Sequence, residues 1–260
     1  MSPLNAFATD NGRHPGSEGV RKARKLTRLL RRPAYRRGLR SGVAAAVEHE
    51  SIPYREDLRT VVDVGAHQGQ FALFALERFP SASIVCLEPL PQPREKLQEV
   101  TGWSHRVRTL AVAASNRTEA EVSMHVSRRD DSSSLQAIGP MQVDAFPGTE
   151  EVGLTVVPVA RLDSLLSESD IADPAMLKVD VQGHEYEVLE GSSAILPAFR
   201  EVAVEASFVE LYEGQRLAGE VTALLEDVGF SLAGVFDVKQ APSRQCLQAD
   251  LLFRRRDPGR

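Results

Sequence analysis

The sequence contains few of the features that stabilise secreted or membrane-spanning chains. Of its 260 residues only two are cysteines, Cys86 and Cys246, which argues against a disulfide framework and is typical of a reducing compartment. No apolar run approaches the roughly 20 residues that a bilayer-spanning helix needs. The first 30 residues also lack the apolar stretch of a secretory signal. These absences predict a cytoplasmic protein, and the hydrophobic fraction of 42% is typical of a soluble globular domain.

Several short motifs with a known chemical mechanism are also missing. The chain has no G-x-G-x-x-G turn, no phosphate-binding P-loop and no G-x-S-x-G nucleophile elbow. The two cysteines and the scattered histidines show no zinc-ligand spacing. Four carboxylates, Asp130, Asp131, Asp180 and Glu205, offer oxygen ligands of the kind that Mg²⁺ prefers. Because nothing fixes their spacing, magnesium is conceivable but not favoured, and we assign no metal ligand.

Positive charge is concentrated near the N-terminus. The net charge is -5, yet residues 21–40 read RKARKLTRLLRRPAYRRGLR and contain no acid. Such a basic arm favours contact with an anionic membrane surface, a nucleic acid or an anionic substrate. The alternative is a solvated helix whose arginines pair with the acidic body. No aromatic platform accompanies the arm, so nucleic acid is disfavoured. We assign residues 1–50 to a partly disordered, partly helical N-terminal extension.

The clearest pattern in the chain is TVVDVGAHQGQFALFALERFPSASIVCLEPL, residues 60–90. It begins with a β-branched, apolar stretch typical of a strand buried on both faces. A G-x-x-x-G turn at Gly65 and Gly69 leads into an apolar helix, and a second apolar strand ends at Glu88. A carboxylate at the end of a parallel strand can accept two hydrogen bonds from a ribose diol. The pattern therefore predicts a nucleoside site.

The spacing of the glycines separates two kinds of nucleoside ligand. A dinucleotide site needs G-x-G-x-x-G and a helix N-terminus aimed at a pyrophosphate. S-adenosylmethionine has no pyrophosphate, and Gly65, which lacks a Cβ, permits a close approach of its methionine part. Asp63 is placed to hold the ammonium group directly or through water, and Glu88 to hold the ribose. We therefore predict S-adenosylmethionine as the cofactor.

A second polar patch follows a predicted central strand, residues 176–181. Asp180 lies near the carboxyl end of this strand, where open α/β sheets bind ligands. Gly183 lets the chain turn, and His184 then falls at the start of a helix whose dipole favours a neutral imidazole. We hypothesise that His184 is a general base, oriented by Asp180 or by Glu205 at the end of the next strand. The alternative is that all three are structural: a core histidine, a helix cap and a hydrogen-bonded strand-end acid.

The order of predicted elements defines the fold class as α/β. Strand and helix patterns alternate from the first strand onward and are followed by two strands, at residues 231–237 and 245–253. This order predicts a mainly parallel sheet with helices on both faces and a C-terminal antiparallel strand pair. We place one domain at residues 51–254 and a mobile tail at residues 255–260.

Together these patches resemble the FkbM family of S-adenosylmethionine-dependent methyltransferases. The resemblance is carried by VVDVGAHQGQFA, CLEPLP, SSSL, LKVDVQGHEYEVLEG and VEASFVELYEGQ, and it covers residues 58–253. It implies a Rossmann-like class I methyltransferase fold with a seven-stranded sheet. Members are typically O-methyltransferases of natural products and glycans, and many modify sugar hydroxyls. By resemblance the cofactor site includes Asp63, Gly65, His67, Gln68 and Glu88.

The resemblance also bears on the second patch, since Asp180, His184 and Glu185 fall on the family's second motif. Asp180 is therefore assigned to the cofactor site as well as to catalysis. The segment of residues 128–149 shows few periodic signals, and we expect it to act as a lid that expels water. Within it, Ser133 is a candidate hydrogen-bond partner of the cofactor or of a sugar. The arginine-rich extension is not part of the family pattern, so its role does not carry over.

These features predict an O-methyltransferase that acts on a sugar hydroxyl of a glycolipid, a polysaccharide or a glycosylated metabolite. An RNA methyltransferase that uses the basic arm is one alternative, and a nicotinamide-dependent oxidoreductase is a less favoured one. A non-catalytic binding module would not need the charged second patch. Peripheral contact with a membrane through the arm, and a homodimer formed through the N-terminal extension, are further expectations.

Overall fold

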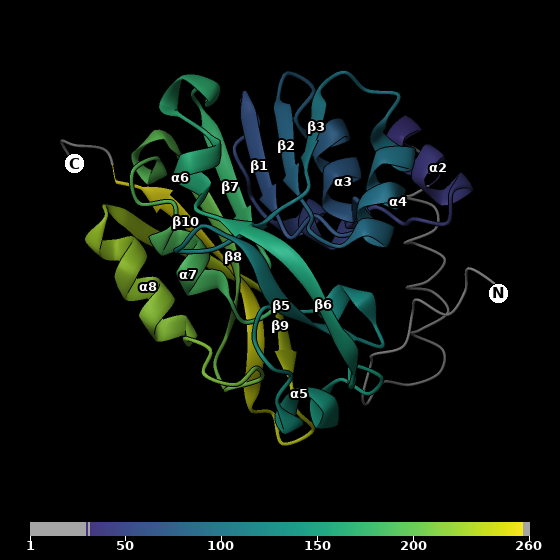
Figure 1. Cartoon of the computed structure of the whole chain (residues 1–260). Coiled ribbons are helices and arrows are strands. Elements are labelled where there is room, and N and C mark those ends of the chain that lie inside the picture. The colour runs from purple at the N-terminus through teal and green to yellow at the C-terminus, as the bar shows by residue number, and fades with distance from the viewer. Residues whose placement is uncertain (1–29, 31, 257–260) are drawn as a thin grey trace.

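The parallel strands predicted from the sequence are five neighbouring strands of one seven-stranded sheet, in a computed structural model that describes residue 30 and residues 32–256 (Figure 1). Its strand order is β3-β2-β1-β7-β8-β10-β9. The first five strands in that order pair in parallel, and β10 is antiparallel to both of its neighbours. The predicted Rossmann-like class I fold is therefore confirmed. The strands are β1 (Thr60–Val64), β2 (Ser83–Leu87), β3 (Val107–Leu110), β7 (Ala175–Val179), β8 (Glu201–Ser207), β9 (Phe230–Gln240) and β10 (Cys246–Arg255).

A second, three-stranded sheet was not expected from the sequence. It consists of β4 (Ala113–Ala114), β6 (Glu151–Ala160) and β5 (Glu119–Ser127), in that order. The sequence VRTLAVA, residues 107–113, has the pattern of a single strand. In the structure the chain leaves the large sheet after Leu110, and Ala113 and Ala114 pair with β6 instead. This departure carries β4 and the loop after β5 to the carboxyl edge of the large sheet.

Helices cover both faces of the large sheet. On one face lie α2 (Pro33–Arg40), α3 (Gln70–Arg78) and α4 (Pro91–Thr101), whose buried side chains join one apolar cluster. On the other lie α6 (Leu162–Leu165), α7 (Glu185–Glu190) and α8 (Ala218–Asp227), which join a second cluster. The remaining short helices are η1 (Val47–Ser51), η2 (Asp130–Ser132), α5 (Pro140–Ala145), η3 (Glu168–Asp170) and η4 (Leu196–Ala198).

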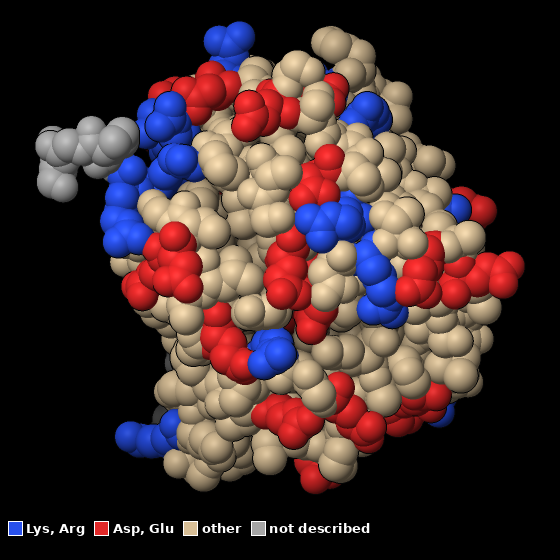
Figure 2. All heavy atoms as spheres, turned by 60° about the vertical axis from the view of Figure 1, so that its left-hand side comes forward, with Lys and Arg blue, Asp and Glu red and all other residues tan. Residues whose placement is uncertain are grey.

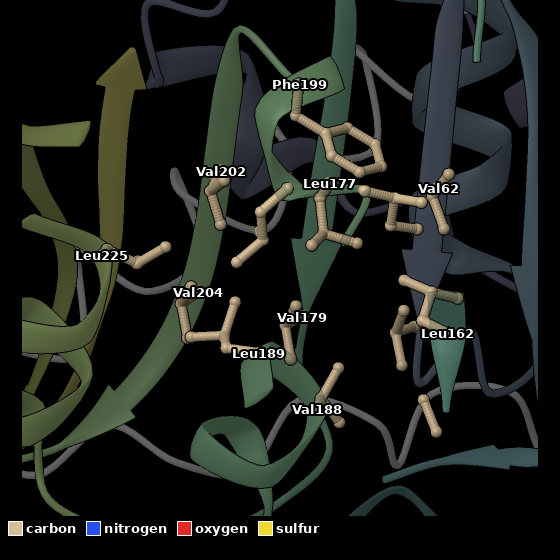
Figure 3. Close-up of a cluster of buried hydrophobic side chains, with 14 of the residues drawn as sticks. Val62, Leu162, Leu177, Val179, Val188, Leu189, Phe199, Val202, Val204 and Leu225 are labelled. Carbon is tan, nitrogen blue, oxygen red and sulfur yellow. The ribbon is translucent and has the colours of Figure 1, made fainter. Parts of the chain in front are cut away.

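The apolar cluster beneath α6, α7 and α8 is built from alternate residues of the parallel strands. Leu177 and Val179 of β7 contribute side chains that are completely buried, and Val188 and Leu189 of α7 pack against them (Figure 3). The cluster on the opposite face is more aromatic, and its rings include His49, Tyr54, Phe71, Phe74 and Phe79.

The described part of the N-terminal extension belongs to the aromatic cluster on the face of α2, α3 and α4. Tyr35 of α2 is 2% exposed, and the backbone N–H of Ala34 donates a 2.5 Å hydrogen bond to Glu77 of α3. Pro33 lies in the first turn of α2, where proline is well tolerated. Residues 1–29, which hold the predicted disordered segment and much of the basic arm, lie outside the described residues.

The C-terminal boundary of the sheet differs slightly from the prediction. Arg255, the first residue of the expected mobile tail, is part of β10 and donates its N–H to the carbonyl of Arg200. Residues 257–260 of that tail lie outside the described part of the chain. No helix among residues 30 and 32–256 is long and apolar enough to cross a membrane. Figure 2 shows acidic and basic side chains interspersed on the face that it presents.

The packing of β7 makes a testable prediction about stability. Replacing Leu177 with alanine leaves a cavity at a completely buried position, and we expect the free energy of unfolding to fall by about 2–5 kcal/mol. Leu154→Ala is the matched control, because Leu154 is 60% exposed and should cost no more than about 0.5 kcal/mol. Urea denaturation measures both. Equal losses in the two variants would contradict the assignment of Leu177 to the core.

Candidate active site

Two clefts open at the carboxyl edge of the parallel strands. The first cleft lies between the ends of β1, β2 and β7, the second sheet and the loop after β5. Its lining residues are Val64, Gly65, His67, Leu87, Glu88, Pro89, Leu90, Val112, Ala113, Ala114, Met124, Asp130, Asp131, Ser133, Leu135, Asp180, Val181, Gln182 and His184. It therefore has an apolar part along Leu90, Val112 and Met124, and a polar part near Glu88 and Asp180.

The second cleft lies beside the first and is rich in polar side chains. It is lined by Ala46, Glu48, His49, Gly65, Ala66, His67, Gln70, Phe71, Arg129, Asp131, Ser132, Gln142, Phe146, Lys178, Asp180, Gln182, Glu205, Lys239 and Gln248. The two clefts meet, because they share Gly65, His67, Asp131, Asp180 and Gln182. A group held in one cleft can therefore reach a group held in the other.

Gly65, just after β1, lies very close to the backbone of Asp180, just after β7. Its backbone has φ +81°, and a Cβ added there would lie 1.8 Å from the carbonyl oxygen of Asp180. Its N–H and that of Ala66 both donate to the carbonyl of Leu87 at the end of β2. The turn is thus fixed to both neighbouring strands, and only glycine allows the approach.

Glu88 follows β2 and is oriented by two backbone donors. Its Oε2 accepts the N–H of His67 at 2.9 Å and its Oε1 accepts the N–H of Leu90 at 2.8 Å. A carboxylate has about four lone-pair positions, so these bonds leave acceptor capacity toward the first cleft. Burial raises the pKa of Glu88 above its usual value, although both backbone donors and His67 oppose the shift. The arrangement suits a carboxylate that receives hydroxyl hydrogen bonds.

His67 and its neighbour Gln68 connect the glycine turn to the loop after β5. The Nε2 atom of His67 lies 3.0 Å from Asp130 Oδ1, and Gln68 Nε2 lies 3.4 Å from Asp130 Oδ2. Burial disfavours the imidazolium, but Asp130 outweighs it and raises the pKa of His67. His67 lines both clefts. Gln68 lines neither, and it is linked to the first cleft only by its contact with Asp130. Ser133 lines the first cleft, and its hydroxyl accepts the N–H of Ser127.

Asp63 lies beneath both clefts rather than in their walls. It is completely buried, and Lys178 Nζ lies 3.1 Å from its Oδ1. The same ammonium group lies 3.4 Å from Asp180 Oδ2. Burial raises the pKa of Asp63, and Lys178 opposes this shift. Asp63 therefore acts on the clefts through Lys178, and the expected contact with a ligand's ammonium group stays a prediction that this geometry does not favour.

Asp180 and Glu205 lie together in the second cleft. The side-chain nitrogen of Gln182 donates to both, at 2.8 Å to Asp180 and 2.9 Å to Glu205. Burial alone would raise the pKa of Asp180, but Lys178 and the bonds from Gln182 and Glu205 hold it below the usual value. Burial and the charge of Asp180 raise the pKa of Glu205 well above its usual value. One of the two acids is therefore ionised while the other keeps its proton.

His184 lies in the first cleft and not among the residues that line the second. It precedes α7, and its Nε2 lies 3.0 Å from the hydroxyl of Ser115. Burial, aided by Arg117, lowers its pKa to about 4, so the ring is neutral near pH 7, as the sequence predicts. Its hypothesised role as general base places it with Asp180 and Glu205. In the structure it shares the first cleft with Asp180 but not the second cleft with Glu205, so the two acids are better placed for that role.

Some residues of the second cleft escaped the sequence analysis. His49 of η1 is 9% exposed, its Nδ1 lies 2.9 Å from the hydroxyl of Tyr54, and burial lowers its pKa to about 4. Lys239 and Gln248 come from the C-terminal hairpin. No local motif marks these positions, because only the packing of distant segments brings them to the cleft.

The loop of residues 128–149 borders both clefts, as expected of a lid. It contains η2 and α5, and Asp131 lies where the clefts meet. Its role in closure stays a prediction. Among the described residues, no group of three or more histidine, cysteine, aspartate or glutamate side chains is arranged to hold a metal ion. Asp130, one of the four suggested magnesium ligands, contacts His67 instead.

The close approach at Gly65 can be tested by comparing two glycines. Gly65→Ala and Gly42→Ala both place a Cβ at a backbone with φ near +80°, but the Cβ at Gly42 meets no atom within 4 Å. We expect Gly42→Ala to cost about 1 kcal/mol of stability and Gly65→Ala to cost clearly more, because Asp180 must move. Thermal unfolding of both variants measures the difference. Equal destabilisation would mean that β1 and β7 tolerate a wider separation.

Comparison with known proteins shows which family the chain resembles. The sequence profile of the methyltransferase FkbM domain matches residues 63–232. The 2-O-methyltransferase NoeI of Sinorhizobium fredii is 30% identical over an alignment of 161 residues, and the match covers 60% of this chain and 66% of that protein. The 31-O-demethyl-FK506 methyltransferase FkbM of Streptomyces tacrolimicus is 30% identical over an alignment of 202 residues, and the match covers 68% of this chain and 74% of that protein.

Solved structures resemble the chain more distantly. The 1,6-didemethyltoxoflavin-N1-methyltransferase of Burkholderia thailandensis, with bound S-adenosylhomocysteine, covers 98% of both chains at a TM-score of 0.42 and 13% identity. Such a weak likeness adds nothing to the assignment. The profile match does, since it covers more than half of the chain and spans the glycine turn, Glu88 and the Asp180–Glu205 pair. The chain therefore belongs to the FkbM family of methyltransferases.

Proposed function

We propose that this protein transfers the methyl group of S-adenosylmethionine to a hydroxyl of a sugar. The observation that carries the proposal is that Asp180 lines both clefts. On one side of it lies the cleft with Glu88 and the glycine turn. On the other lies the polar cleft, in which Asp180 and Glu205 lie together. A methyl donor in the first cleft and a hydroxyl in the second would then meet beside Asp180.

The residues of the first cleft fit S-adenosylmethionine. Glu88 has acceptor capacity for the ribose hydroxyls, and Leu90, Val112 and Met124 offer an apolar surface for a flat base. The absence of a Cβ at Gly65 lets a ligand pass close to the backbone. The ligand supplies a methyl group on a positively charged sulfur, and the acids near Asp180 favour that charge. Both curated relatives carry names of O-methyltransferases.

The second cleft suits a neutral polyhydroxyl acceptor. Its wall combines carboxylates with the amides of Gln70, Gln142, Gln182 and Gln248, groups that donate to and accept from hydroxyls. Its cations are paired: Lys178 contacts Asp63 and Asp180, Lys239 contacts Asp237, and Arg129 contacts Asp131. A phosphate or carboxylate would find no free cation among the described lining residues. These features favour a sugar over an anionic acceptor.

The chemistry asks little of the protein beyond positioning and removal of one proton. The acceptor oxygen bonds to the methyl carbon while the sulfur–carbon bond breaks, so alignment of the two clefts supplies much of the rate. A sugar hydroxyl is a poor nucleophile and must lose its proton during the attack. Asp180 and Glu205, on the acceptor side, are placed to take it.

Three kinds of acceptor would fit a cleft that binds sugar hydroxyls. A glycolipid, a polysaccharide or a glycosylated metabolite would each present sugar hydroxyls. A lipid-linked acceptor would also give a role to the basic arm, as a contact with anionic lipid. Residues 21–29 and 31 of that arm lie outside the described residues. The proposal includes a homodimer, and a cytoplasmic protein that associates with the membrane.

The first test is binding of the cofactor product. We expect calorimetry to show micromolar affinity for S-adenosylhomocysteine. Glu88→Gln should weaken this affinity by about 10- to 100-fold, because hydrogen bonds to a charged acceptor contribute about 1.5–3 kcal/mol. Glu95→Gln, on the exposed side of α4, is the control and should bind normally. Preference for NADH over S-adenosylhomocysteine would replace the proposal with an oxidoreductase.

The acceptor class can be tested with labelled S-adenosylmethionine. We expect labelled methyl groups to appear on members of a panel of methyl glycosides and not on total RNA. Transfer to RNA, weakened strongly by added salt and by removal of residues 1–29, would instead support a nucleic-acid methyltransferase. The two outcomes separate the leading proposal from its main alternative, because only the alternative depends on the basic arm.

The position of His184 leads to a separate expectation. His184→Ala removes the bond to Ser115 from the wall of the first cleft, so we expect affinity for S-adenosylhomocysteine to fall by about 2- to 10-fold. A base acting on the acceptor would show the opposite pattern, with normal affinity and no turnover. His125→Ala is the control, because His125 pairs with Glu151 at the surface of the second sheet. Calorimetry and the labelled-methyl assay together decide between the two roles.

A further inference from the structure

Gln182 places its side-chain amide between the two carboxyl groups of the second cleft. Its Nε2 lies 2.8 Å from Asp180 Oδ1 and 2.9 Å from Glu205 Oε2. An amide nitrogen carries two N–H donors, which is the number that this arrangement needs. Gln182 therefore joins the residue that follows β7 to a residue of β8 across the cleft.

The backbone of Gln182 is unfavourable for a glutamine. Its φ of +59° lies in the left-handed region, where a Cβ is costly and glycine is not. Gly183 beside it has φ +98°, and a Cβ there would lie 2.8 Å from Tyr212 Cβ. The packing of Tyr212 therefore shapes this turn. Glycine at position 182 would suit the backbone better, which indicates that the side chain has a function.

Tyr212 packs against the oxygen end of the Gln182 amide. Its hydroxyl lies 2.9 Å from Gln182 Oε1 and 3.0 Å from the carbonyl oxygen of Ser132, and its single proton donates to one of these two acceptors at a time. The two acids orient the amide, because they accept from its nitrogen and leave Oε1 facing Tyr212. The ring of Tyr212 is 1% exposed, so its own position is fixed by packing.

We propose that Gln182 is a positioning residue that holds Asp180 and Glu205 as one proton-accepting pair for the acceptor hydroxyl. The inference rests on the proposed function, because it assigns the proton acceptor of that reaction. As the oxygen–methyl bond forms, the sulfur–methyl bond breaks and its electrons stay on sulfur. The hydroxyl proton passes to the pair. After the product departs, the pair releases this proton to solvent. Gln182 keeps the ionised oxygen aimed into the cleft.

The charges around the pair agree with this role. Asp180 and Glu205 share the amide nitrogen of Gln182, and the opposite directions of their pKa shifts favour one ionised and one protonated acid in the pair. One place for a further proton therefore remains, and it is the place that the substrate needs. The other charged groups that act on the pair include Lys178 of β7, Glu185 of α7, Lys239 of β9 and Asp250 of β10.

Two glycine substitutions separate a positioning role from a structural one. Gln182→Gly and Arg244→Gly each remove a side chain from a left-handed backbone, since Arg244 has φ +67° at an exposed turn. We expect the unfolding temperature of both variants to hold or rise. With saturating S-adenosylmethionine and methyl glycosides, only Gln182→Gly should lose kcat, by about 10- to 100-fold. A kcat for Gln182→Gly within about two-fold of wild type would overturn the proposal.

A second readout needs no acceptor. Carbon-13 NMR of labelled aspartate and glutamate carboxyls follows the proton on the pair as pH changes. Without the donors of Gln182 the ionised form is less stable, so the apparent pKa of the pair should rise in Gln182→Gly. Tyr212→Phe, which keeps the ring against Gly183, should shift it in the same direction by less. Unchanged titration in both variants would overturn the role of Gln182.

The two proposals fail differently. If the wild-type protein does not bind S-adenosylhomocysteine while the titration still shifts in Gln182→Gly, the proposed function is wrong and the hold of Gln182 on the pair stands. If S-adenosylhomocysteine binds and methyl glycosides are methylated equally by wild type and Gln182→Gly, the proposed function stands and Gln182 has no positioning role.

Discussion

The buried lysine of β7 is the interaction on which the rest of the site depends. Lys178 stands beside Asp63 in the register of β7 and β1, and its ammonium group also contacts Asp180. Removing one partner of a buried ion pair costs about 3–5 kcal/mol, so the three groups are retained together. Because Lys178 favours the ionised form of Asp180, the neighbouring Glu205 keeps its proton. The protonation of the second cleft thus follows from a contact beneath it.

This charged layer is tolerated because the same strands are apolar elsewhere. Side chains alternate between the faces of a strand, and in β7 Leu177 and Val179 point into the apolar cluster under α7 while Lys178 points to the opposite face. On that opposite face, Met176 at the amino-terminal half of β7 is again apolar and completely buried. Polar groups are therefore confined to the carboxyl end of one face, where the clefts expose them to ligand and water. Stability comes from the remainder of the sheet.

The sequence allowed the parts of this site that depend on local signals to be predicted. The Gly65 turn and Glu88 follow from strand, glycine and acid within one short segment, and the structure places both in one cleft. His49 reaches the second cleft only because η1 packs on α3, a long-range contact without a motif. The second sheet was missed for the same reason, since β4 pairs with a distant strand. His184 lies at a helix start as predicted, but the cleft that it faces depends on packing.

Two strained residues mark the place where the clefts meet. His67 and Gln182 both have positive φ without being glycine, and both line the two clefts. Such conformations cost about 1–3 kcal/mol each and persist only where the surroundings fix them. Each is fixed by a side chain from another segment, His67 by Asp130 and Gln182 by Tyr212. Since Tyr212 also bonds to the carbonyl of Ser132, next to Asp131 in the same loop, one loop holds both turns. A movement of that loop would therefore change both clefts at once.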